Sequence, residues 1–194
     1  MRHPTLEIIR DEHQALAAML HSLSMLLAQS RREQRLPDFD VLRAMLFYID
    51  EFPERLHHPK ESELLFPLVA ARCPELAPLI ERLEREHSDG EHAVRELQHA
   101  LLAFEMMGEA RRAVFEQAAE RYVRHYLLHM ALEEQEILPA AQRCFTPQDW
   151  APMDEAFAAN ADPLSGQHPA PPDYRPLFQR ILMTAPAPVG LGPA

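Results

Sequence analysis

The sequence predicts an all-α protein, arranged as an up-down-up-down antiparallel four-helix bundle with a short extra helix and a Pro-rich C-terminal tail. One supporting observation is composition. The 194 residues include only 5 Gly and 7% aromatics and are rich in Leu, Ala, Glu and Arg, which favours helices over strands. The other is periodicity, because apolar residues recur at steps of three and four in four long segments joined by short loops.

The first helix is predicted over residues 5–30. Its apolar stripe runs through Leu6, Ile9, His13, Leu16, Leu20, Leu23 and Leu27. His13 lies within that stripe, so its side chain should face the core of the bundle.

The second helix is predicted over residues 38–73, beginning at an Asp N-cap. Pro53, Pro59 and Pro67 interrupt it, and each removes a backbone donor. We therefore expect at least one kink and a frayed or broken turn around Pro53 to Pro59. Such prolines could also splay the helices and admit a small molecule.

The third and fourth helices are predicted over residues 74–107 and 109–143. Gly108 separates them, and glycine is the residue that most often ends a helix. Four long helices with short connections place neighbouring helices antiparallel.

The segment 146–194 differs in composition from the predicted bundle over 1–145. Thr146-Pro-Gln-Asp is typical of a helix start, so a short helix is expected to about Asn160. Many of the 18 prolines lie beyond Asp162, and that stretch should be irregular or extended. An apolar island within it could dock on the bundle or form a homodimer contact; it consists of Tyr174, Leu177, Phe178, Ile181 and Leu182.

Charge and composition limit the partners of the chain. The formal net charge of −11 argues against nucleic-acid binding. No apolar run approaches the ~20 residues of a membrane span, and the N-terminus lacks the apolar segment of a signal peptide. Cys73 and Cys144 are expected at the same end of the bundle but on diagonal helices, as inert thiols unable to build a disulfide framework, which favours a cytoplasmic location.

Two copies of one motif stand out, beginning at His57 and at His129. In each copy a Glu follows the His by four positions, a Pro follows that Glu by six, and the motif ends in Arg-Cys. A His and a Glu four apart share one face of a helix, roughly 6 Å apart along its axis, so both can reach one ion. The spacing alone is a weak signal, because His3/Glu7 also has it; the shared context raises the two copies above chance.

Each copy is preceded by a helix with a lone inward His, in Arg10-Asp-Glu-His13 and Arg85-Glu-His87. The bundle would thus bring four imidazoles and two carboxylates to one depth, a donor set that suits two first-row metal ions. Burying six such groups without metal would cost several kcal/mol. The rival Glu-x-x-His scheme fails on the fourth helix, where Tyr122 and Tyr126 occupy the places of the acids.

This order of residues resembles the hemerythrin-like HHE cation-binding family over about residues 5–145, and the run from His57 to Pro67 is similar to its second-helix signature. The resemblance implies a four-helix fold and a non-haem di-iron centre, oxo- or hydroxo-bridged, although Zn and Mn accept the same ligands. Members bind O2 or NO, sense redox state or iron, or repair iron–sulfur clusters. Carried onto this chain, the implied metal ligands are His13, His57, Glu61, His87, His129 and Glu133.

The chain departs from the oxygen-carrying members in two places. They have a fifth His four residues after the third-helix His, where this chain has Glu91, a further candidate ligand. Their fourth-helix acid lies five residues after its His, where this chain has Glu134, with Glu133 at four. More carboxylate and less imidazole would favour the ferric state, hence redox sensing, peroxide or NO chemistry, or iron handling.

Several side chains keep alternative roles. His58 follows His57 directly and is expected at the surface. His125 could be a ligand or could orient one, and Tyr122 and Tyr126 could pack in the core or donate to a bound oxygen. The first functional hypothesis is a di-iron protein that binds or senses O2, NO or peroxide; the alternatives are a di-iron enzyme and a metal-gated interaction module.

Overall fold

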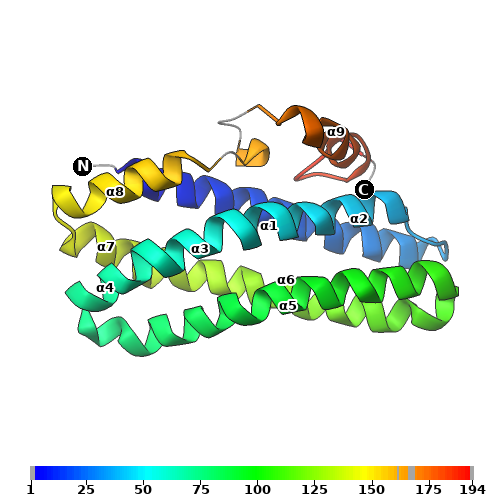
Figure 1. Cartoon of the computed structure of the whole chain (residues 1–194). Coiled ribbons are helices and arrows are strands. Elements are labelled where there is room, and N and C mark those ends of the chain that lie inside the picture. Colours follow the sequence, from blue (N-terminus) through cyan, green and yellow to red (C-terminus); the bar gives the residue numbers. More distant parts are fainter. Residues whose placement is uncertain (1–2, 161, 166–168, 193–194) are drawn as a thin grey trace.

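The computed structural model describes residues 3–160, 162–165 and 169–192, and it confirms the all-α prediction. Four long helical runs lie side by side along the molecule (Figure 1). The first is α1 (Pro4–Arg32). The second joins α2 (Phe39–Ile49), η1 (Asp50–His57), α3 (His58–Lys60), η2 (Glu61–Leu65) and α4 (Phe66–Arg72). The third joins η3 (Pro74–Leu76) and α5 (Ala77–Met107), and the fourth joins η4 (Gly108–Arg111), α6 (Arg112–Leu132), η5 (Glu133–Ile137) and α7 (Leu138–Cys144).

The second long run begins, and the third ends, at the residue that the sequence indicates. The Asp38 side chain accepts hydrogen bonds from the backbone of Asp40 and Val41 and so caps the second run. Gly108 ends α5 at a φ of +68°, a conformation that side chains with a Cβ rarely adopt. Within the described residues, no helix is both long enough and apolar enough to cross a bilayer.

The core consists of two apolar clusters separated along the bundle axis. On α1, Leu6 and Ile9 belong to one cluster and Leu16 begins the other. His13 lies between them on that helix. The other three runs repeat the arrangement, so the predicted polar residues occupy a layer between two apolar ones.

The prolines widen the second run instead of breaking it, so the expected frayed turn is not found. Segments η1, η2 and η5 are π-helical. The backbone N–H of Phe66 bonds to the carbonyl of Glu61, and that of Leu138 bonds to Glu133, five residues back in each case. A proline ring clashes with the carbonyl four residues before it in a regular α-helix, and a wide turn relieves that clash. The Glu-to-Pro spacing of the motif thus places a wide turn at each glutamate.

The C-terminal segment packs on the bundle. As predicted, Thr146 caps a short helix, α8 (Pro147–Ala158), in a reciprocal pair of hydrogen bonds with Asp149. The expected irregular stretch is wrong for residues 175–184, which form α9 (Arg175–Thr184) after two short turns, η6 (Pro163–Ser165) and η7 (Pro172–Tyr174). Helix α9 lies beside α2 (Figure 1). Its Phe178 and Ile181 are buried in the core of the same chain.

Replacement of Phe178 by Ala should lower the free energy of unfolding by about 3–5 kcal/mol, because it removes a buried ring from the core. The matched control is Leu182→Ala on the exposed face of α9, which should cost under about 1 kcal/mol. Urea unfolding of both variants measures the difference. Equal, small losses would mean that α9 does not dock on the bundle in solution.

Candidate metal centre

Four histidines, one from each long run, meet in the polar layer. The Nε2 atoms of His13 and His57 lie 3.2 Å apart, and those of His87 and His129 lie 2.9 Å apart. Two imidazole nitrogens that each lie ~2.1 Å from one ion can be at most about 4.2 Å apart, and both separations are well within that limit. The four rings therefore form two pairs, each spaced to hold one ion.

Two glutamates, Glu61 and Glu133, lie between the histidine pairs with no exposed surface. Glu61 Oε2 is 3.2 Å from His57 Nε2 and 3.6 Å from His87 Nε2. Glu133 Oε1 is 3.0 Å from His129 Nε2, and its Oε2 is 3.4 Å from His13 Nε2. Each carboxylate thus faces both pairs, the position of a bridging ligand.

All four oxygens of these two carboxylates lack a hydrogen-bond partner among the residues that the structure describes. Buried carboxylates without hydrogen bonds are rare, because leaving water unpaired costs several kcal/mol. Cations between the carboxylates and the imidazoles would satisfy those oxygens. The residues present therefore fit a two-metal centre.

The second ring nitrogen of each motif histidine, His57 and His129, bonds to a glutamate that was not among the sequence-predicted site residues. His57 Nδ1 donates to Glu12 Oε2 at 2.6 Å, and His129 Nδ1 donates to Glu86 Oε2 at 2.9 Å. Glu12 and Glu86 each stand directly before a lone histidine. That shared neighbour was the available signal, and its role is to hold the histidine of the next run with Nε2 facing the ions.

The lone histidines, His13 and His87, are held by residues of the two repeated motifs. His13 Nδ1 donates to Glu134 Oε1 at 3.0 Å, and His87 Nδ1 lies 2.9 Å from the hydroxyl of Ser62. Ser62 and Glu134 each directly follow one of the two buried glutamates. Glu134 therefore orients an imidazole in this arrangement and does not lie among the facing donor atoms.

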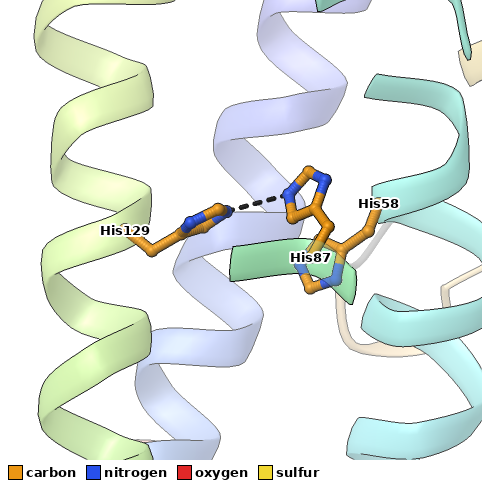
Figure 2. A group of neighbouring side chains, drawn as sticks. All are labelled: His58, His87 and His129. Atoms are coloured by element: carbon orange, nitrogen blue, oxygen red, sulfur yellow. Dashed lines mark hydrogen bonds between the residues drawn. The ribbon is translucent and has the colours of Figure 1, made fainter. Parts of the chain in front are cut away.

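The structure places His58 in the core, which corrects the expected surface position. The side chain is buried, its Nδ1 donates to Glu54 Oε2 at 3.1 Å, and its ring stacks on His87 with centroids 4.3 Å apart. Figure 2 shows His58 beside His87, with His129 facing them. Nitrogens of these three rings lie within 4.8 Å of one another, so the second pair gains a third imidazole. Burial, then repulsion by His87, lowers the pKa of His58 to about 4, which leaves a neutral ring at pH 7.

Tyr122 and Tyr126 fix the carboxylate behind His58. Their hydroxyls donate to Glu54 Oε1 at 2.8 and 2.6 Å. A Cβ at Gly90 would overlap the Tyr126 hydroxyl, so this position on α5 admits only glycine without a shift. The tyrosines therefore anchor a hydrogen-bonded chain that ends at His58.

Two further candidates lie outside the cluster. The side chain of Glu91 is 48% exposed and pairs with Arg95 at 2.6 Å. The half-buried ring of His125 lies 6.3 Å from the ring of His129 and lines a separate surface depression beside Tyr122.

Two openings reach the centre from different sides. A cavity of about 10 Å³, room for one water-sized molecule, touches His13 and His57 and is lined in part by Pro53. On the other side, an open depression of about 360 Å³ touches His58 and His87. Pro53 lines the smaller cavity, and a role of the prolines in admitting a small molecule stays a prediction.

The C-terminal segment supplies one wall of the smaller cavity. Asn160 donates to Glu12 Oε2 at 3.0 Å and also accepts from Lys60. Asp162 accepts from the Tyr48 hydroxyl at 2.7 Å, and burial raises the pKa of Asp162 to about 6. Residues beyond the predicted bundle thus contact the glutamate that orients His57.

The metal-free protein should lose stability as the pH rises from about 6.5 to 9. Burial opposes the charge of His129, but Glu133 and Glu86 outweigh it and raise its pKa to about 9. A histidine whose pKa is raised in the folded state contributes its full stabilisation, roughly 3 kcal/mol here, at pH values below its pKa in the unfolded chain. That contribution is lost as the pH rises through its pKa in the folded state. Chemical unfolding of chelator-treated protein between pH 6 and 10 tests this. His129→Gln should flatten the dependence of the free energy of unfolding on pH, and replacement of the exposed His92 by Gln should not. The same pH dependence in both variants would contradict the assignment of the effect to His129.

A comparison with protein families agrees with the geometry. The model of the Hemerythrin HHE cation binding domain matches residues 5–141. Comparisons with curated proteins and with solved structures found no match. The matched segment contains the four facing histidines and both buried glutamates. The chain belongs to the hemerythrin HHE cation-binding domain family.

Proposed function

We propose that the chain is a di-iron protein that binds or senses a small molecule of the size of O2, NO or peroxide, built on the family's up-down-up-down antiparallel bundle. The observation that carries this proposal is the set of four unpartnered carboxylate oxygens on Glu61 and Glu133, between facing imidazoles. Such a set needs positive charge at the two positions where the imidazole nitrogens converge.

The two halves of the centre would hold their ions differently. The first position has two imidazoles, His13 and His57, and the second has His87, His129 and His58. Glu61 and Glu133 would serve both positions. Iron at such a centre supplies reversible electron transfer and open coordination positions. The protein supplies fixed tautomers, because Glu12 and Glu86 keep the protons of their histidines on Nδ1.

The small molecule would bind on the side of His13 and His57. That half has fewer histidines, and the cavity of about 10 Å³ lies against it. A space of this size excludes organic substrates and admits a water-sized or diatomic molecule. Asn160 and Asp162 place polar groups in the same cavity wall.

His58 changes the expected balance of donors. With Glu91 outside the cluster and His58 within it, the centre would have five imidazoles and two carboxylates. Such a donor set would favour the ferric state less than the carboxylate-rich set expected from the sequence. O2 binding therefore becomes as suitable as NO or peroxide chemistry. Zn and Mn would accept the same donors. The enzyme and interaction-module alternatives stay predictions.

Protein purified aerobically should contain about two irons per chain, with near-ultraviolet bands of bridged ferric iron. The double variant His57→Ala/His129→Ala should lose both the metal and the bands, because it removes one imidazole from each position. The matched control His92→Ala/His99→Ala alters two exposed histidines and should keep both. Zinc alone, or well-folded protein that binds no metal, would overturn the di-iron proposal.

His58→Ala should weaken binding of one ion by about 10–100-fold and leave the other bound, because only the second position loses an imidazole. Glu91→Ala alters an exposed carboxylate and should bind two ions as before. Iron titration of metal-free protein, followed by absorbance, measures both affinities. If Glu91→Ala loses an ion and His58→Ala does not, Glu91 and not His58 is the additional ligand of the second position.

A further inference from the structure

The two cysteines that end the repeated motifs meet at one end of the bundle. Cys73 follows α4 and Cys144 ends α7, and these two helices contact each other. Their sulfur atoms lie 2.7 Å apart. Both cysteines lie at the same end, as the sequence predicts, but their contact corrects the expectation that diagonal helices keep two inert thiols apart. The contact also removes the ground on which a cytoplasmic location was expected.

The two sulfur atoms are closer to each other than the van der Waals contact distance of two packed thiols. A disulfide bond is about 2.05 Å long, so a shift well under 1 Å would bring the sulfurs to bonding distance. Cys73 is 2% exposed and packs in the apolar cluster, whereas Cys144 is partly exposed. An oxidant in solution would therefore reach Cys144 first.

We propose that Cys73 and Cys144 form a reversible disulfide, with a hydroperoxide as oxidant and a small thiol as reductant. The Cys144 thiol first loses its proton, and the thiolate attacks one peroxide oxygen. The O–O bond breaks, Cys144 becomes a sulfenic acid, and the hydroxide that leaves takes up the thiol proton as water. The Cys73 sulfur attacks the Cys144 sulfur, the S–O bond breaks, and the thiol proton leaves with the hydroxyl group as water. In total, two thiols lose two electrons and two protons, and one H2O2 becomes two waters.

The contact also assigns the order of attack. The Cys73 thiol donates to the Cys144 sulfur, and this hydrogen bond is the main cause that raises the pKa of Cys73 to about 11. Cys73 therefore keeps its proton at neutral pH, which suits the resolving thiol better than the attacking one.

The bond would join the two runs that carry the buried glutamates. Glu61 lies in the run that ends in α4, and Glu133 lies in the run that ends in α7. The link would close a loop containing all of α5 and α6. A long closed loop restricts the unfolded chain, so the oxidised protein should be more resistant to heat.

The test is peroxide oxidation of reduced protein, both as purified and after chelator treatment, followed by alkylation of free thiols and mass spectrometry. We expect loss of both alkylation sites, a mass lower by about 2 Da and a cross-linked peptide containing Cys73 and Cys144. The unfolding temperature should rise by roughly 5–15 °C and return on reduction with dithiothreitol. The chelator-treated sample separates this result from any effect of bound metal.

Two variants assign the separate roles of the cysteines. Cys73→Ser should accumulate a sulfenic acid on Cys144 that dimedone traps, and Cys144→Ser should react with peroxide at least ~10-fold more slowly. The wild-type mass measurement does not depend on the folding of either variant. Folded wild-type protein that keeps both thiols alkylatable after peroxide, or that links only between molecules, would overturn the proposal.

Discussion

Two buried carboxylates without hydrogen bonds are the constraint on which this structure depends. Glu61 and Glu133 lie where an apolar bundle would otherwise have continuous packing, and the core is divided there into two clusters. Four histidines face the carboxylates, and each histidine has a polar partner that fixes its other nitrogen. Such an arrangement is unfavourable as a metal-free core and favourable as a metal site, because cations there would satisfy the four carboxylate oxygens of Glu61 and Glu133 that accept no hydrogen bond.

The sequence repeat explains how a single chain builds this centre. The Glu before each lone histidine orients the histidine of the next run, and the residue after each buried glutamate contacts the lone histidine of the other half. The proline after each glutamate sets a wide turn that starts at that glutamate. The halves differ in the buried residue that follows the motif histidine, which is His58 in the first copy and Met130 in the second. That difference gives one ion position an additional imidazole and leaves the other nearer the small cavity.

The sequence predicts the positions that obey helical periodicity and misses those that depend on neighbouring runs. His13 and His87 could be placed because they interrupt apolar stripes. His58 could not, because adjacent helical residues point in different directions. In this bundle the second run is covered on two sides, so His57 faces α1 while His58 faces α5 and α6. Helix α9 was missed because a Pro-rich composition indicates irregular structure, although Pro176 stands at the start of that helix, where proline is tolerated.

The C-terminal segment gives this chain a feature that the matched domain does not contain. The family match ends at residue 141, yet Asn160 contacts Glu12, and Asp162 lines the cavity beside His13 and His57. The orientation of His57 thus depends on a hydrogen bond that begins outside the bundle. Since the first ion position has fewer imidazoles, its environment depends more on that cavity wall than the second position does. Selectivity for one small molecule over another would therefore arise from the extension, while the repeat would hold the metal.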